Sequence, residues 1–278
     1  MAEPVARGKR PAHGQPVVDR TLALLDSFNG DRRSLTLSQL AATTGMPIST
    51  TSRLAQSLLR WGALERLPSG EFVIGVKLWE VASLAPRGHG IREAAAPFME
   101  DLYEVSRHHV ALAVLDGAEA VLIERLSSRR APEILGRLGG RLPLRTTAVG
   151  RVLLAAESAT FRDETIAQPP DAFFEAESEL TPGEMRKELA EVARLGYAVV
   201  RRKRPSATIA IASPILGPRR QVVAAISIVA PDGALSPPLV VPALRATARS
   251  ISRALGYRPP QSDGTRSRSD AAAAPLTP

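Results

Sequence analysis

The sequence has no cysteine, and this absence removes several classes of chemistry. Disulfide frameworks, thiolate nucleophiles and thiolate metal sites are all excluded. Histidine is also rare, since only His13, His89, His108 and His109 are present. No carboxylate cluster with the spacing of metal ligands accompanies the histidine pair, for which a structural role is the simpler interpretation. The sequence therefore predicts neither a metal site nor a cofactor.

Long apolar runs are missing as well. No segment approaches the roughly 18 consecutive apolar residues of a membrane span, and the N-terminal stretch MAEPVARGKRPAHGQP lacks the apolar core of a signal peptide. Neither a G-x-S-x-G nucleophile elbow nor a Walker A loop occurs, so no catalytic residues are predicted. These absences favour a cytoplasmic protein that makes no membrane contact and is not an enzyme.

Positive charge is present in excess. The 278 residues include 36 Lys and Arg against 28 Asp and Glu, which gives a formal net charge of +8. Such a balance favours an anionic partner, which can be nucleic acid, an acidic membrane surface or an acidic metabolite. Apolar residues make up 44% of the chain and charged residues 23%, close to globular averages. Most of the chain is therefore expected to fold, and its length favours two domains.

Changes of composition along the chain predict five segments. Residues 1–16 read as a flexible basic arm, and residues 258–278 as a disordered tail. The tail is rich in Pro, Ser and Ala, so it cannot bury enough apolar surface to offset its ordering entropy. Between them we expect a helical and hairpin domain over 17–75, a linker helix within 76–90, and a mixed α/β domain over 91–257.

The first of these domains reads as three short helices and a hairpin. Apolar spacing predicts helices over 18–28 and 35–44, the second with Ser38 able to cap it. Gly45 breaks that helix, and a third helix follows over 47–61. The stretches ALERL and EFVIG then read as two short strands around a PSG turn.

The third helix begins with small hydroxyl residues, which are weak helix formers. Apolar residues line one face of this helix, and the opposite face carries Ser49, Thr50, Ser52, Arg53 and Gln56. Two helices joined by a glycine turn suggest a helix-turn-helix, whose second helix packs on the protein and lies in the DNA major groove. Short hydroxyls permit close approach to phosphates, while Arg53 can reach guanine and Gln56 adenine. Alternatively, the hydroxyl run only supplies N-caps to a surface helix.

The hairpin after this helix turns the motif into a winged helix. Its tip, LPSG, would lie by the DNA backbone or minor groove, with Arg66 near a phosphate. Plain solvation of Arg66 is the alternative. The predicted DNA contacts are Ser38, Ile48, Ser49, Thr50, Ser52, Arg53, Gln56, Arg66 and Ser69.

The second domain alternates helical and β-rich segments. Asp116-Gly117 between two apolar runs is a strong hairpin signal. Thr181 and Glu184 have the spacing of a capping box, with a proline between them, and the TTAVG segment reads as a loop entering a helix. The other expected elements are helices over 91–107 and 242–255 and strands over 133–138, 197–202, 208–216 and 221–229.

On these residues the chain resembles the IclR family of bacterial transcription regulators. The stretches that carry the resemblance are RTLALLDSF, SLTLSQLAATTGMPISTTSRLAQSLLRWGALER, GEFVIGVKLWEVASL, GGRLPLRTTAVGRVLLA, LTPGEMRKELAEVARLGYAV, IASPIL and VVAAISIVAPDGALS. They span about Val17–Tyr257. The resemblance implies an α+β fold with an N-terminal winged helix-turn-helix, a linker helix and a GAF-like effector domain. It also implies a homodimer or dimer of dimers on a pseudo-palindromic double-stranded operator, and a small organic acid as effector.

The effector site is expected where the loop before residue 148 enters a helix, because free N–H groups and the helix dipole suit an anion there. The family has a similar loop beside its ligand pocket, and Ser227 matches a position that contacts ligand through a hydroxyl. The resemblance implies contacts from Thr146, Thr147, Ala148, Gly150, Lys203, Ala210, Ser227 and Val229. Alternatively, Thr146 or Thr147 merely caps the helix and Gly150 allows close packing.

One segment departs from the family's pattern. Members usually carry acidic residues, a glycine and a cysteine where this chain has Val200–Lys203, Ala207 and Ala210. The basic run Arg201–Arg204 either draws a more anionic or larger ligand, or is a solvated loop at a site that has lost its ligand. Three functions stay open: a ligand-responsive regulator, a DNA-binding regulator whose second domain only oligomerises, and an enzyme that acts on an anionic metabolite.

We expect the linker helix to couple the two domains, because its packing sets the spacing of two winged helices in a dimer. A ligand can act through it only by binding the two dimer geometries with different affinity. Its apolar residues Leu78, Trp79 and Leu84 are alternatively plain core or dimer contacts.

Overall fold

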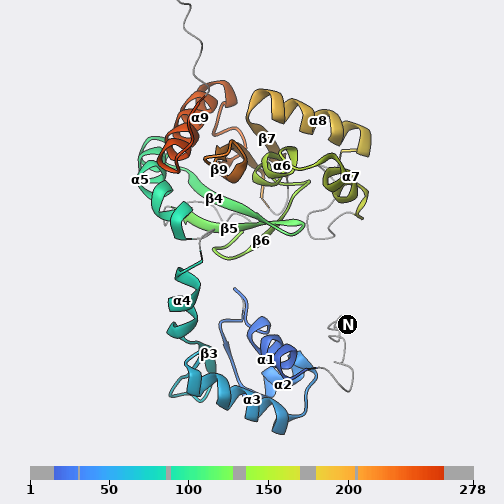
Figure 1. Cartoon of the computed structure of the whole chain (residues 1–278), viewed down its shortest axis with the longest axis vertical. Coiled ribbons are helices and arrows are strands. Elements are labelled where there is room, and N and C mark those ends of the chain that lie inside the picture. The colour runs from blue at the N-terminus through green and yellow to red at the C-terminus, as the bar shows by residue number, and fades with distance from the viewer. Residues whose placement is uncertain are drawn as a thin grey trace, which may run out of the picture.

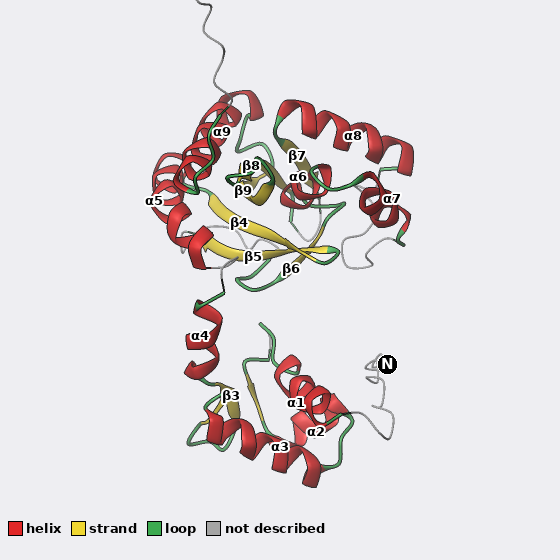
Figure 2. Ribbon diagram, in the orientation of Figure 1, coloured by secondary structure: helices red, strands yellow, loops and turns green. Residues whose placement is uncertain are grey.

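The computed structural model of the protein describes residues 16–30, 32–85, 89–127, 136–169, 180–203 and 206–259. The chain forms a small N-terminal domain and a larger α/β domain, with helix α4 (Val76–Ser83) between them (Figures 1 and 2). Most of the predicted basic arm and tail, and the first half of the strand expected over 133–138, lie outside the described residues. None of the helices in these ranges has both the length and the apolar composition that a bilayer crossing requires.

The N-terminal domain consists of three helices and a three-stranded sheet. Its elements are α1 (Val17–Asp26), β1 (Ser34–Leu35), α2 (Leu37–Thr44), α3 (Ile48–Trp61), β2 (Leu64–Arg66) and β3 (Phe72–Ile74). Strand β3 lies between β1 and β2 and is antiparallel to both. The predicted helix-turn-helix and hairpin are therefore confirmed. Strand β1 was not expected, because two residues are too few to show an alternating pattern.

Helix α2 begins later than its apolar spacing predicts. Leu35 pairs with Phe72 in the sheet, and Thr36 is the N-cap. Thr36 Oγ1 accepts from Gln39 N at 3.3 Å, and Thr36 N donates to Gln39 Oε1 at 2.8 Å. The prediction that Ser38 caps a helix starting at residue 35 is wrong. Thr36 is the N-cap instead, because it forms a reciprocal capping box with Gln39.

A six-stranded antiparallel sheet forms the centre of the second domain. Its order is β6-β5-β4-β9-β8-β7. The strands are β4 (His109–Asp116), β5 (Glu119–Leu126), β6 (Arg141–Pro143), β7 (Ala198–Arg202), β8 (Thr208–Leu216) and β9 (Val222–Pro231). The hairpin predicted at Asp116-Gly117 joins β4 to β5. Within the described residues 136–138 there is no strand, and the edge position is taken by β6 instead.

Within the described residues, five helices cover the two faces of this sheet. They are α5 (His89–Ser106), α6 (Ala148–Ala155), α7 (Ala159–Ala167), α8 (Pro182–Leu195) and α9 (Pro237–Ala254). The capping box at Thr181 is confirmed. Helix α9 begins five residues before its predicted start, because Pro237 rather than Pro242 occupies the first turn, where a missing N–H has no consequence. Helix α7 was not predicted.

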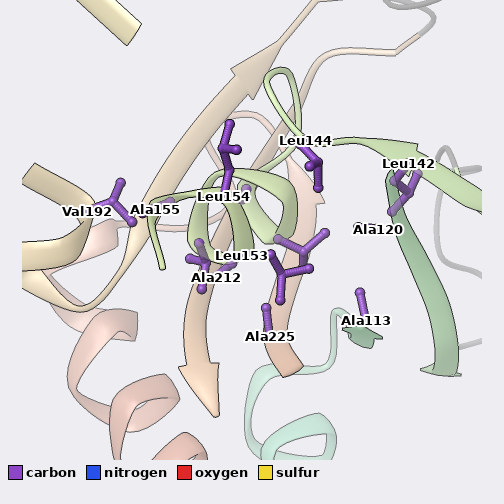
Figure 3. Close-up of a cluster of buried hydrophobic side chains, with 14 of the residues drawn as sticks. Ala113, Ala120, Leu142, Leu144, Leu153, Leu154, Ala155, Val192, Ala212 and Ala225 are labelled. Carbon is purple, nitrogen blue, oxygen red and sulfur yellow. The ribbon is translucent and has the colours of Figure 1, made fainter. Parts of the chain in front are cut away.

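The two faces of the sheet differ sharply in side-chain size. The face toward α5 and α9 carries large residues at alternate positions, among them Ile209, Ile211, Ile226 and Ile228. The face toward α6 and α8 carries small ones, among them Ala111, Ala113, Ala120, Ala198, Ala212 and Ala225. Figure 3 shows the sheet residues Ala212 and Ala225 near Leu153 of α6. Because small side chains leave room, α6 packs closely between this face and α8, and all eight of its residues are buried. One end of the layer stays hollow.

Candidate nucleic-acid interface and ligand cavity

Helix α3 has one buried and one open face, as the sequence predicts. Its buried residues are Thr51, Leu54, Ala55 and Leu58. The two leucines and the alanine belong to the core of the N-terminal domain. Thr51 is fully buried and donates from Oγ1 to Pro47 O at 3.1 Å. This bond satisfies the only hydroxyl on the inner face, so the remaining polar groups of the helix are directed outward.

The outer face of α3 is available to a partner. Ser49, Arg53 and Gln56 are exposed, and Thr50 and Ser52 are half-buried. Among the described residues, no hydrogen bond or ion pair engages the side chains of these five residues. Ile48, at the start of the helix, is also exposed. A row of hydroxyls, a guanidinium and an amide without partners is the chemistry that phosphates and base edges bind.

The wing residues have local partners. Arg66 donates from Nε to Gly70 O at 3.1 Å and lies over the ring of Phe72, with 5.7 Å from Cζ to the ring centroid. Ser69 donates from Oγ to Glu71 Oε2 at 3.0 Å. Arg66 and Ser69 are exposed, so they can still reach a duplex. Ser38 is exposed on α2, the first helix of the motif.

The linker helix α4 is attached to both domains. On one side, Val76 N donates to Glu65 Oε1 at 2.9 Å, and Gly75 N donates to Ala63 O at 2.8 Å. On the other side, Arg92 of α5 lies over the ring of Trp79, with 5.7 Å from Cζ to the centroid. Arg92 Nε in turn pairs with Glu124 Oε2 on β5 at 2.7 Å. A chain of contacts therefore runs from the wing through α4 to the large sheet.

A cavity of about 60 Å³ lies between the start of α6 and the small-residue face of the sheet. About 10–15 Å³ of such space holds one water molecule, so the cavity has room for several atoms of that size. Five of the eight predicted effector contacts line it, namely Thr147, Ala148, Ala210, Ser227 and Val229. Sheet register brings them together, because Ala210 pairs with Val229 and the strand β9 that holds Ser227 lies between β4 and β8.

Three predicted contacts do not line this cavity. Thr146 Oγ1 is buried with no hydrogen-bond partner among the described residues, and Thr146 borders a different hollow beside β6. A Cβ on Gly150 would lie 2.6 Å from backbone atoms of Leu144, so this glycine serves close packing. Lys203 follows β7 and is exposed. Thr147 both lines the cavity and caps α6, accepting from Gly150 N at 3.1 Å.

The basic run is divided by the pleat of β7. Arg201 points outward, where its Nε lies 3.4 Å from Asp232 Oδ1. Arg202 points inward and lines the cavity beside Thr208, its cross-strand neighbour. Burial lowers the pKa of the Arg202 guanidinium below its ordinary value, but arginine stays charged at physiological pH. The described part of the run, residues 201–203, is thus divided between cavity and solvent, and Arg204 lies outside the described residues.

Sequence reasoning named none of the other eight lining residues as an effector contact. They are Ala111, Leu122, Leu142, Val149, Val200, Arg202, Ser206 and Thr208. The period of two along β7 and β8 could have indicated that Val200 and Arg202 face the same side as Ala210. The lining combines apolar walls with one cation and several hydroxyls, which suits a small anion with an apolar body.

A winged helix with an open polar recognition face, followed by an α/β domain with an internal cavity, defines a two-domain DNA-binding regulator. Comparison with known proteins agrees. Residues 17–68 match the IclR helix-turn-helix domain, and residues 85–253 match the bacterial transcriptional regulator IclR C-terminal domain. The chain belongs to the IclR family of bacterial transcriptional regulators.

Individual relatives match along almost their whole length. The chain is 30% identical to the HTH-type transcriptional regulator KipR of Bacillus subtilis, over 86% of this chain and 97% of the relative. It is 30% identical to the HTH-type transcriptional repressor AllR of Escherichia coli K12, over 93% and 95%. Among solved structures, an IclR homologue from Microbacterium hydrocarbonoxydans in complex with 4-hydroxybenzoate has a TM-score of 0.82 and 32% identity, over 86% and 99%.

Proposed function

We propose that this IclR-family regulator binds a pseudo-palindromic operator in the cytoplasm as a homodimer or dimer of dimers, and that a small organic acid in the α6 cavity modulates the binding. The observation that carries the proposal is the outer face of α3, where the predicted base-reading groups are open and without partners in the described part of the chain. A helix placed in the major groove needs such a face.

The residues of α3 divide into two roles in this proposal. Arg53 and Gln56 read base edges, because their side chains are long and exposed. The hydroxyls of Ser49, Thr50 and Ser52 bind phosphates and hold the helix close to the duplex. At the margins of the interface, Ser38, Ile48, Arg66 and Ser69 contact the DNA backbone.

An apolar surface supports the dimer. Trp79 and Leu84 are 56% and 80% exposed, so they do not belong to the core of their own subunit, whereas Leu78 packs on the N-terminal core. Helix α1 adds further exposed apolar side chains, Val17, Val18 and Leu22. Apolar patches of this kind on α1 and α4 mark an interface, and a second copy of the chain would bury them.

The proposed effector is a carboxylic acid with an apolar body. Its carboxylate would pair with Arg202, and its body would contact the alanine and valine walls, with Ser227 available as a hydrogen-bond donor or acceptor. The Microbacterium relative was solved with 4-hydroxybenzoate, an aromatic acid of this chemistry. The positive charge of Arg202 favours retention of an anionic ligand over loss of the site.

Effector binding would reach the DNA through α4. Leu122, on β5, lines the cavity, and Glu124 on the same strand holds Arg92, which lies over Trp79. The other end of α4 is bound to the wing through Glu65 and Val76. A ligand that binds the two arrangements of this chain of contacts with different affinity shifts the spacing of the winged helices.

The deciding experiment is footprinting on the DNA that flanks the protein's own gene, with and without 4-hydroxybenzoate and other small organic acids. We expect a protected pseudo-palindrome whose occupancy changes with one of the acids. Absence of any protected site would refute the DNA-binding mode.

Two alternatives have distinct signatures. If the second domain only oligomerises, the operator is protected but no acid changes the thermal melting of the protein. If the protein is an enzyme, one of these acids is turned over.

A further inference from the structure

A second hollow, separate from the α6 cavity, lies at the end of the C-terminal domain formed by α8 and α9. It is a groove of about 690 Å³ between the ends of α6 and α8, the turn joining β8 to β9, and helix α9. This volume falls within the range of small-molecule sites, roughly 300–1,000 Å³. In Figure 1, α8 and α9 lie at the end of the domain away from α4 and the winged helix.

Arginine dominates the lining of the groove. Arg245, Arg249 and Arg253 are spaced four residues apart on α9 and therefore share one exposed face. Arg194, from the last turn of α8, and Arg220, from the β8–β9 turn, also line the groove. The acidic lining residue in the described part of the chain is Glu157 alone.

These charges are largely uncompensated. Arg194 pairs with Glu191 at 3.6 Å, and both side chains are mostly exposed. The guanidinium groups of Arg220, Arg245, Arg249 and Arg253 make no hydrogen bond or ion pair with another described residue. Like charges four residues apart on a helix are unfavourable, so an anion in the groove would relieve a repulsion that the folded chain otherwise carries.

Structural roles account for only part of this cluster. The guanidinium of Arg245 lies next to Gly196, the residue that ends α8. A positive charge there is stabilised by the negative end of the α8 dipole. One arginine is enough for that role. Arg220 adopts a φ of 64°, a left-handed conformation that favours glycine or asparagine. The backbone conformation of this turn therefore does not explain why the residue is an arginine.

We propose that this groove binds a small molecule that carries two or more phosphate groups and a planar ring, and that the regulator thereby responds to a second anionic ligand. Guanidinium forks match phosphate oxygens bidentately, and arginines one turn apart are roughly 6 Å apart along the helix axis, which suits a chain of phosphates. Tyr257, half-buried in the lining, offers a face on which a nucleobase can stack.

This proposal is independent of the effector in the α6 cavity and of operator binding. Helices α8 and α9, which line the groove, lie at the end of the domain remote from α3 (Figure 1), so DNA held by the recognition helix does not lie beside them. A phosphorylated small molecule can therefore occupy the groove on free and on operator-bound protein.

Calorimetric titration of the full-length protein with ATP and with inorganic triphosphate, without magnesium, tests the groove. We expect both to bind, and the double variant Arg245→Gln/Arg249→Gln to weaken both at least tenfold. Arg220→Gln should also weaken them. Arg219→Gln is the matched control, because Arg219 lies in the same turn and is exposed but does not line the groove. It should change either affinity less than twofold.

Three further variants locate the ligand. Tyr257→Ala should reduce the affinity for ATP to that for triphosphate, while Tyr257→Phe retains it. Arg53→Ala should leave both titrations unchanged, since the winged helix is a separate basic surface. Thermal melting of every variant confirms that it is folded.

The proposal is overturned if the folded wild-type protein binds neither ATP nor triphosphate, or if Arg219→Gln weakens them as much as Arg220→Gln. It is also overturned if the groove variants lose affinity only for a glutamate-rich peptide or for a non-operator duplex. The groove would then be a docking site for an acidic protein segment or for nucleic acid.

Discussion

At the scale of single residues, Arg53 carries the sharpest prediction about DNA recognition. Arg53→Ala should weaken operator binding by roughly 1–3 kcal/mol and relax the preference at one base pair, because a bidentate contact to guanine is lost. Fluorescence anisotropy with an operator series measures both effects. Arg60→Ala is the control, since Arg60 is exposed near the other end of α3 and donates to Ser57 Oγ at 3.0 Å. An equal loss on specific and random DNA would show that Arg53 contacts only the backbone.

Arg202 and its neighbour Arg201 offer a matched pair for the effector cavity. Arg202→Gln should raise the dissociation constant of 4-hydroxybenzoate, used as a probe, about tenfold or more, because the half-buried cation in the cavity lining is removed. Arg201→Gln should have little effect, since that side chain points outward toward Asp232.

Ser227→Ala should leave DNA binding intact and reduce the ligand response. A normal response in the Ser227 variant would show that the cavity is not the effector site.

Arg151 provides a test of packing at the same scale. It is 5% exposed, donates from Nε to Arg145 O at 2.9 Å and lies 3.3 Å from Glu188. Burial lowers its pKa, which the nearby Glu188 carboxylate partly opposes. Arg151→Ala should destabilise the domain by roughly 3–5 kcal/mol, because Glu188 and a carbonyl lose their partner. Urea unfolding measures this, and a loss below about 1 kcal/mol would contradict the buried role.

At the scale of elements, the joint between the winged helix and α4 depends on Gly75. A Cβ at this position would overlap the carbonyl oxygen of Gly62, which ends α3. Gly75→Ala should therefore cost roughly 1–3 kcal/mol of stability and disturb the alignment of α3 with α4. Thermal unfolding and operator affinity should both fall. Gly183→Ala is the control, because a Cβ there meets no atom within 4 Å.

For the molecule as a whole, the net charge of +8 makes operator binding an electrostatic process. The logarithm of the binding constant should fall linearly with the logarithm of salt concentration as counterions are released. Arg66→Gln should reduce that slope by about one for each phosphate contact removed. Arg107→Gln should leave it unchanged, because Arg107 directly follows α5 and pairs with Glu104 on the last turn of that helix. A slope unaffected by Arg66→Gln would mean that the wing does not contact phosphate.

The predictability of the fold varies with the range of the interactions involved. Local signals gave the helix-turn-helix, the Asp116-Gly117 hairpin and the Thr181 capping box, because each depends on residues a few positions apart. Local signals failed where two residues close together in the sequence could each start the same helix. Thr36 with Gln39 replaced Ser38 as the cap of α2, and Pro237 replaced Pro242 at the start of α9.

The sequence by itself determined the two faces of α3, because the helical period alone separates Leu54 and Leu58 from Arg53 and Gln56. The period of two along β7 separates Arg201 from Arg202, but only the tertiary structure decided that the side of Arg202 faces the cavity, since that depends on the register of β7 against β8 and on the packing of α6 against the sheet. It alone also gathered arginines 194, 220, 245, 249 and 253 into one groove. The physical reason is that the helical period is a property of a short segment, whereas sheet register and helix packing are settled by contacts between residues far apart in the chain.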